Sequence, residues 1–226
     1  MLFNGASHAD TAKPGDWGSS GCDASLPIRV IVARGTEESA TSSSISPVAD
    51  GIAAAFPGQV QVSMLDYAAS WDAGSEADGV NRLVAMLNGQ AGQCPATRTV
   101  LLGYSQGAMV VGDALSEAAA RYNEDNGYTL SDAARKQVAA VELFGDPRFD
   151  ASASYDAGDY DHARDGILEA RDSAALGWVA SRTVSYCNAD DFACQVGGEG
   201  APHAAYATNG AFPKAVAFAV DALKRD

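Results

Sequence analysis

Short apolar runs alternate with amphipathic helical patterns along most of the chain, and this alternation restricts its possible folds more than any other feature. Five runs read as buried strands, because they lack the apolar–polar alternation of a half-exposed strand. They span residues 28–33, 60–65, 99–104, 138–144 and 182–187. Helical patterns fall between them. The sequence therefore predicts a three-layer α/β/α sandwich around a central, five-stranded parallel sheet.

Size and charge narrow the class of protein further. A chain of 226 residues suits one domain. No apolar run approaches the roughly 18 residues of a membrane span, so stable membrane insertion is not expected. The chain carries 29 Asp and Glu against 15 Lys and Arg. This acidic excess argues against nucleic acid as a partner, because phosphates would be repelled. We expect a monomer.

Four cysteines predict two disulfides. Their even number, without a C-x-x-C pair, favours disulfides over a zinc site or a redox motif, with four reduced core thiols as the alternative. Cys187 and Cys194 bracket a short loop, so we pair them, which leaves Cys22 with Cys94. Disulfides imply an oxidising compartment, and hence a secreted protein. Residues 1–21 lack the basic start and apolar stretch of a signal peptide, so we expect a flexible tail there.

The segment Gly103 to Gly107 reads GYSQG, with a predicted strand before it and a helical pattern after it. This G-x-S-x-G pattern is typical of a nucleophile elbow when it joins a strand to a helix. Its glycines remove side chains that would collide at a sharp turn. Ser105 would then stand at the carboxyl edge of the sheet, where open α/β sheets bind ligands. The alternative is a Gly-Ser turn that only caps a helix.

A serine nucleophile needs a base and an acid, which follow it in chain order in this type of site. His203 lies after the fifth predicted strand and is the histidine that fits this order. The loop CNADDFAC offers Asp190 and Asp191 as the acid. Asp146, which follows the fourth strand, is a rival that we interpret as a structural turn residue.

Two further groups of residues complete the predicted site. The amide of Gln106 and the loop after the first strand, with Thr36, can supply oxyanion donors. A long acidic segment, residues 147–181, contains apolar residues that either contact an acyl chain or pack as a surface excursion. The tentative substrate-binding residues are Ile167, Leu168, Leu176, Trp178 and, beside the histidine, Pro202.

The motifs IVARGTEE, GYSQGA, VELFGDPR, YCNADDFAC and APHAAY occur in an order and spacing that resemble the cutinase family of serine esterases. The resemblance covers residues 22–226, which we therefore expect to form one catalytic domain. FGDPR and the segment after it are most similar to the actinobacterial branch. The resemblance implies an α/β-hydrolase fold and hydrolysis of cutin-like polyesters or of short- to medium-chain acyl esters.

The resemblance also implies roles for single residues. Ser105 matches the nucleophile, Asp191 the acid and His203 the base, with Thr36 and Gln106 as oxyanion donors. The family's bridges match Cys22–Cys94 and Cys187–Cys194. No metal or organic cofactor is implied. Acetylxylan esterase and mycolyl esterase activities are the alternatives within the fold, and a non-catalytic cell-wall binding protein is a third.

Overall fold

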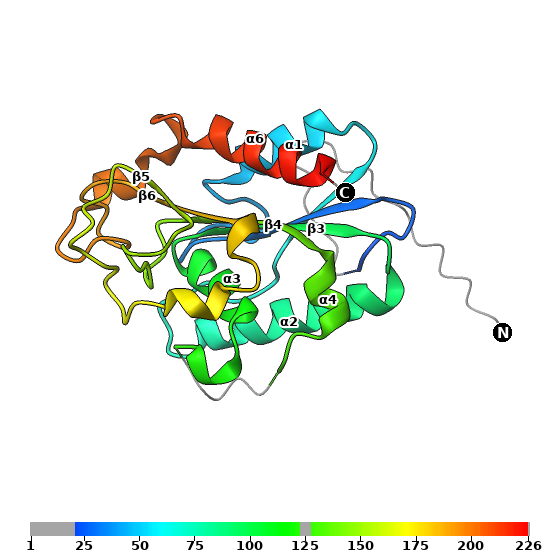
Figure 1. Ribbon diagram of the computed structural model, residues 1–226, viewed down its shortest axis with the longest axis horizontal. Helices are drawn as coiled ribbons and strands as arrows, with labels where there is room; N and C mark the ends of the chain where they lie inside the picture. The colour runs from blue at the N-terminus through cyan, green and yellow to red at the C-terminus, as the bar shows by residue number, and fades with distance from the viewer. Residues whose placement is uncertain (1–20, 123–127, 226) are drawn as a thin grey trace.

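The computed structural model describes residues 21–122 and 128–225, which form an α/β sandwich around a six-stranded sheet (Figure 1). The strand order is β2-β1-β3-β4-β6-β5, and every neighbouring pair is parallel. The strands are β1 (Ile28–Ala33), β2 (Val60–Met64), β3 (Arg98–Tyr104), β4 (Val138–Phe144), β5 (Asp156–Gly158) and β6 (Thr183–Cys187).

Helices cover both faces of this sheet. The first face carries α1 (Ser46–Ala55) and α6 (Ala211–Lys224), and the second carries α2 (Ser75–Gln93), α3 (Gln106–Leu115) and α4 (Asp132–Gln137) (Figure 1). Helix α5 (Gly200–His203) is a single short turn. Three-residue and four-residue 3₁₀ turns occupy Ala118–Ala120, Ser173–Leu176, Ala180–Arg182 and Ala205–Ala207. Among the described helices, none is both long and apolar enough to cross a membrane.

Alternate residues of each central strand fill two separate cores. In β3, Val100 and Leu102 pack with α1 and α6, whereas Leu101 packs with α2 and α3. All three are fully buried. Burial on both faces explains why the strands are continuously apolar in sequence, as in other parallel sheets.

The structure confirms the predicted sandwich and corrects the number of strands from five to six. The additional strand, β5, has the sequence DAG and lies within the long segment 147–181. It pairs with β6 at the edge of the sheet through backbone groups. Because this pairing does not require apolar side chains, the sequence shows no hydrophobic pattern for β5. The expected N-terminal tail lies outside the described residues, except for Gly21.

A buried ionic network ties the segment after β4 to helix α3. Asp113 of α3 accepts from Arg148 at 2.8 Å and from Arg171 at 2.9 Å, and Arg171 also contacts Asp146 at 2.5 Å. All four side chains are at least nine-tenths buried. Two cations and two anions compensate each other in a buried site, where losing one partner would leave a costly unpaired charge.

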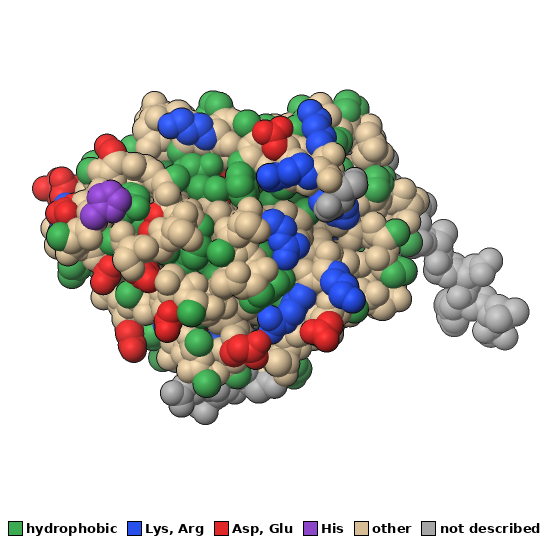
Figure 2. Space-filling model, viewed as in Figure 1, with side chains coloured by type: hydrophobic (Ala, Val, Ile, Leu, Met, Phe, Trp, Pro, Cys, Tyr) green, Lys and Arg blue, Asp and Glu red, His purple; other side chains and the backbone are tan. Residues whose placement is uncertain are grey.

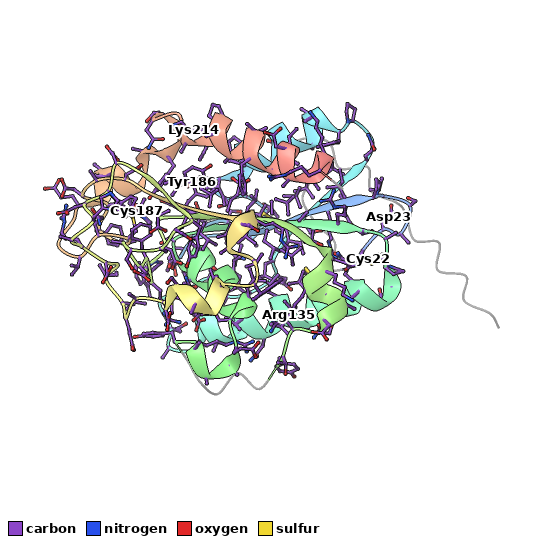
Figure 3. All side chains as sticks on the ribbon, in the orientation of Figure 1. Cys22, Asp23, Arg135, Tyr186, Cys187 and Lys214 are labelled. Carbon is purple, nitrogen blue, oxygen red and sulfur yellow. A yellow bond between two sulfur atoms is a disulfide. The ribbon has the colours of Figure 1, made fainter. Side chains whose placement is uncertain are left out.

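The two predicted disulfides are both present. Cys22–Cys94 joins the start of the described chain to the end of α2, and Cys187–Cys194 closes a loop after β6. Cys22 and Cys187 lie toward opposite ends of the molecule (Figure 3). One bridge therefore fastens the chain end, and the other shapes a loop at the carboxyl edge of the sheet.

Asp156 of β5 carries an electrostatic cost. Both of its carboxylate oxygens are buried without a hydrogen-bond partner. Burial, reinforced by the nearby charge of Asp150, raises the pKa of Asp156 to about 8. Between its unfolded value, about 4, and that folded value, the folded protein binds more protons than the unfolded one. The contribution of Asp156 to the free energy of unfolding is therefore most favourable at low pH, and it is lost as the pH rises through about 8.

We expect Asp156→Asn to remove this dependence. Relative to the variant, the wild-type free energy of unfolding should fall between pH 5 and pH 8, as measured by urea denaturation at each pH. Asp221→Asn, at an exposed position of α6, is the control and should track the wild type. Parallel curves for wild type and Asp156→Asn would contradict the assignment.

Candidate active site

Ser105 is the single residue between β3 and α3. Its backbone has φ 54° and ψ −120°, a conformation that residues other than glycine rarely adopt. Such strain costs about 1–3 kcal/mol and persists where the surroundings enforce it. Here the Ser105 N–H donates to the carbonyl of Phe144 on β4, at 2.8 Å. The chain therefore holds the hydroxyl-bearing residue at a sharp strand-to-helix turn.

The flanking glycines of GYSQG make this turn possible. A Cβ on Gly103 would meet the backbone of Gly107 and Ala108, and one on Gly107 would overlap the carbonyl of Ala33 on β1. Helix α3 thus starts in direct contact with the ends of β1 and β3. Any larger residue at these positions would push the helix, and Ser105 with it, away from the sheet.

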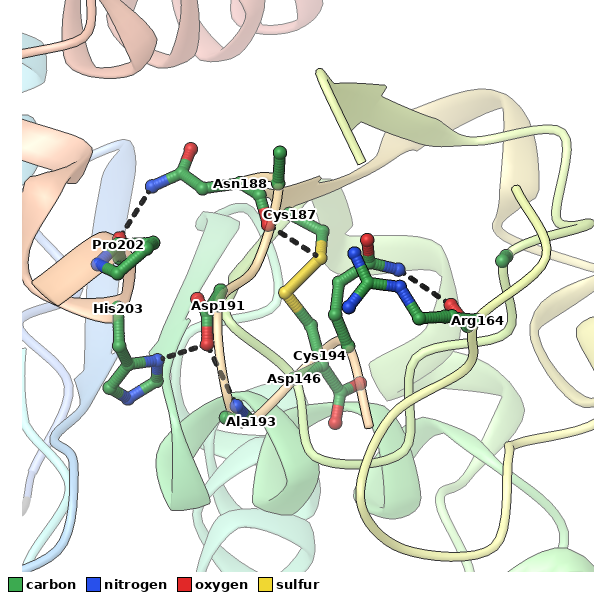
Figure 4. Close-up of a disulfide and its surroundings, with 12 residues drawn as sticks. Asp146, Arg164, Cys187, Asn188, Asp191, Ala193, Cys194, Pro202 and His203 are labelled. Carbon is green, nitrogen blue, oxygen red and sulfur yellow. Dashed lines mark hydrogen bonds and ion pairs between the residues drawn. A yellow bond between two sulfur atoms is a disulfide. The ribbon is translucent and has the colours of Figure 1, made fainter. Parts of the chain in front are cut away.

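Asp191 lies in the loop after β6, and His203 ends the short helix α5 that follows it (Figure 4). His203 Nδ1 is 2.8 Å from Asp191 Oδ1, which also accepts the N–H of Ala193 at 2.8 Å. Asp191 is fully buried, and His203 is 8% exposed. Because the partner of Nδ1 is a carboxylate, that nitrogen carries the proton, which leaves Nε2 as an acceptor.

Aromatic side chains fix the plane of the imidazole. The ring of Tyr104 stacks on His203 with 4.9 Å between centroids, and Phe192 packs edge-on at 4.7 Å. The Tyr104 hydroxyl also donates to the His203 carbonyl at 3.1 Å. Since Tyr104 immediately precedes Ser105, one strand end positions both the serine and the histidine.

The loop after β1 passes against the same turn. A Cβ on Gly35 would meet the Tyr104 ring at 2.8 Å and Ser105 Cβ at 3.4 Å, so Thr36 lies beside the serine. Glu38 holds this loop, because its carboxylate accepts the N–H of Gly35 at 2.7 Å. The same carboxylate accepts from the hydroxyl groups of Ser43 and Ser44.

Gln106 begins α3 and fastens a second loop to the site. Its side-chain amide donates to the carbonyl of Ser70 at 2.9 Å and accepts from the Ser75 hydroxyl at 3.0 Å. Its backbone N–H belongs to the first turn of α3, whose free amides favour negative charge. Thr36 and Gln106 therefore both line the same cleft as Ser105.

These elements border a cleft of about 410 Å³. Thr36, Ser105 and Gln106 are among its polar lining residues. The larger apolar side chains of its lining are Trp71, Met109, Tyr122, Ile167, Leu168 and Phe192. The cleft can therefore hold an apolar group beside the serine hydroxyl.

Of the five predicted substrate-binding residues, two line the cleft and three lie elsewhere. Ile167 and Leu168 line the cleft, as expected. Leu176 does not, because it is fully buried in the core beside α3. Trp178 also packs there: its indole N–H donates to Leu115 O, and the guanidinium groups of Arg135 and Arg182 both contact its ring. Pro202 does not line the cleft, and its carbonyl accepts from the amide of Asn188 at 2.7 Å.

The prediction for Leu176 and Trp178 rests on their apolar character, and that for Pro202 on its place beside His203. A leucine or tryptophan in a loop is equally suited to fill a core and to line a cleft. The rival acids also separate in space. Asp190 forms an exposed ion pair with Arg164, and Asp146 contacts Arg171, so neither is the partner of His203.

Two residues of the site escaped the sequence analysis. A Cβ on Gly145 would overlap the His203 ring, so only glycine leaves room for the imidazole there. The Tyr206 hydroxyl donates to Asp191 Oδ2 at 2.6 Å. The spacing of His203 and Tyr206, three residues apart, is the signal that could have suggested a shared partner.

Comparison with known proteins gives a consistent family. The family model described as Cutinase matches residues 24–223. Acetylxylan esterase 2 of Talaromyces purpureogenus is 32% identical over 79% of this chain and 80% of its own length. Carboxylesterase Culp1 of Mycobacterium bovis is 31% identical over 87% of this chain and 81% of its own length.

Solved structures agree with this relationship. The catalytic core domain of acetyl xylan esterase from Trichoderma reesei superposes with a TM-score of 0.75 and 28% identity, over 87% of this chain and 98% of that one. The family match covers nearly all described residues, and its relatives are named as esterases. The chain therefore belongs to the cutinase family and is a serine ester hydrolase.

Proposed function

We propose that Ser105, His203 and Asp191 form the catalytic triad of this esterase. The observation that carries the proposal is the hydrogen bond from the His203 ring to the fully buried Asp191, beside a serine held in a strained turn. The carboxylate holds the imidazole in one tautomer and stabilises its cation. Thr36 and Gln106 supply the oxyanion donors.

The reaction is a two-step acyl transfer. His203 Nε2 takes the Ser105 proton as Oγ bonds to the ester carbonyl carbon. The N–H groups of Thr36 and Gln106 donate to the oxyanion that forms. The C–O bond to the alcohol then breaks, and the imidazolium protonates the departing oxygen. Water attacks the acyl-enzyme by the same route, releasing the acid and restoring Ser105.

The lining of the cleft is suited to binding neutral, largely apolar esters, such as cutin-like polyesters or short- to medium-chain acyl esters. Apolar side chains dominate its lining beyond the serine. In the described part of the chain, the charged residues that line it, Asp72 and Glu76, are both acidic. Many of the Lys and Arg side chains on the face in Figure 2 gather elsewhere, near α4 and the end of α6. An anionic substrate would therefore be repelled at the cleft.

A carbohydrate acetyl ester is the second candidate substrate. The relatives named as acetylxylan esterases favour it. Trp71 is 78% exposed at the cleft, next to Asp72. A flat ring beside a carboxylate can contact a sugar face and its hydroxyl groups. We also propose that the protein acts outside the cell, because its two disulfides suit an oxidising compartment.

The deciding experiment compares p-nitrophenyl esters from acetate to palmitate with acetylated xylan. For Ser105→Ala we expect kcat to fall by several orders of magnitude, roughly 10⁴-fold or more, because the nucleophile is lost. Ser181→Ala, at an exposed position, is the matched control. Near wild-type turnover in Ser105→Ala would refute the triad. A maximum at butyrate to octanoate supports the cutinase-type substrate, and activity confined to acetate with xylan deacetylated supports the second candidate.

The double variant Ile167→Ala/Leu168→Ala tests the acyl side of the cleft. Losing apolar contacts worth about 1 kcal/mol should lower kcat/KM for octanoate roughly five-fold relative to acetate. Val196→Ala shortens an exposed apolar side chain that does not line the cleft and should leave the ratio unchanged. An unaltered chain-length preference in the double variant would remove both residues from substrate binding.

Removing the two disulfides should have different consequences. Cys22→Ala/Cys94→Ala should lower the unfolding free energy by about 2–4 kcal/mol. It should leave kcat near wild type, since Cys94 precedes the start of β3 and Ser105 follows its other end. Cys187→Ala/Cys194→Ala should lower kcat as well, because that bridge closes the loop that carries Asp191. Thermal unfolding and kcat below the transition are the measurements. Equal kcat in both variants would contradict the expectation.

A further inference from the structure

The carboxylate of Asp191 is bound on both of its oxygens. Oδ1 accepts from His203 Nδ1 and from the Ala193 N–H, each at 2.8 Å. Oδ2 accepts from the Tyr206 hydroxyl at 2.6 Å. The triad described above uses only the first oxygen, so the contact on Oδ2 has no role in it.

We propose that Tyr206 is a positioning residue of the catalytic site, whose hydroxyl holds the Asp191 carboxylate in the orientation that binds His203. The inference rests on the proposed function of Ser105, His203 and Asp191. Tyr206 acts through Asp191 and does not touch the reacting atoms.

Local structure explains how two side chains reach one carboxylate. His203 ends the short helix α5, and Tyr206 lies in the 3₁₀ turn Ala205–Ala207 that follows. Residues three apart on successive helical turns face the same side. Both side chains therefore hydrogen-bond Asp191, the imidazole through Oδ1 and the phenol through Oδ2.

The phenol is itself held in place. Its ring packs edge-on against Tyr104 at 6.4 Å and against Phe144 at 5.6 Å, and Tyr206 is 2% exposed. Its oxygen accepts the Asn188 N–H at 3.4 Å, which leaves the hydroxyl proton for Asp191. Burial, together with the adjacent carboxylate, raises the pKa of Tyr206 well above its usual range. The group therefore stays protonated and serves as a donor.

The direction of the effect on catalysis follows from charge. A fully buried carboxylate needs its donors, and each one spreads its negative charge. Without the phenol, Asp191 loses a fixed orientation and places more negative charge on His203. The imidazolium is then stabilised in the free enzyme, so the histidine holds its proton to higher pH. The acid limb of the plot of kcat/KM against pH should therefore move to higher pH.

Tyr206→Phe is the first test, because it removes the hydroxyl and keeps the ring. We expect kcat to fall roughly 10- to 100-fold, the scale of a hydrogen bond to a charged group. KM should stay within about two-fold, and the acid limb should shift to higher pH. Tyr186→Phe is the matched control: Tyr186 is 5% exposed, stacks on Phe144 at 4.8 Å and is not bonded to Asp191.

A second variant makes the sign of the shift testable without loss of packing. Placing 3-fluorotyrosine at position 206 keeps the shape of the side chain and makes the phenol a stronger donor. The acid limb should then move to lower pH, opposite to Tyr206→Phe. The same substitution at position 186 should leave the profile in place.

The outcomes separate this inference from the proposed function. Hydrolysis that survives Ser105→Ala would refute the triad and this inference with it. Hydrolysis that depends on Ser105, with kcat and the acid limb unchanged in Tyr206→Phe, would refute the positioning role alone. Equal shifts at positions 186 and 206 would also refute it, because they would report a general effect of altering buried tyrosines.

Discussion

The crossing of α3 over the ends of β1 and β3 is the contact on which the rest of the site depends. Gly107 lies against the carbonyl of Ala33, and Gly103 lies against the start of the helix. This close approach leaves one residue, Ser105, to reverse the chain, which accounts for its strained backbone. It also brings the loop after β1 and the first turn of α3 to the same cleft as Ser105. The proposed nucleophile and the proposed oxyanion donors thus depend on one packing contact.

The other half of the site depends on buried polar groups rather than on regular structure. Asp191 lies in a disulfide-closed loop and is bonded by two side chains and a backbone amide. A charge removed from water is tolerable only when it is so compensated. The same rule governs Asp113, which α3 presents to two buried arginines. These buried contacts hold the loops beside the cleft in place, as the sheet holds Ser105 in place.

Much of the fold could be predicted from the sequence, since buried parallel strands leave continuous apolar runs. The ends of β1 and β4 coincide with the predicted ranges. The edge strand β5 could not be predicted, because its pairing depends on the backbone of β6 and its residues DAG carry no pattern. Leu176 and Trp178 show the converse limit: both are apolar, and only packing reveals that they face a core.

Patterns along the chain were enough to predict the alternation of strands and helices, the glycine-flanked serine at a strand-to-helix turn, and the two cysteine pairs. These features are local, or follow from periodicity and spacing along the chain. The residues alone left Asp190 and Asp191 open as the acid, and the family resemblance implied Asp191; the folded chain shows that Asp191 is the one that contacts His203. Tertiary structure alone decided that Tyr206 reaches the same carboxylate. The physical reason is that a hydrogen bond depends on where loops bring side chains together, and a residue's type does not contain that information.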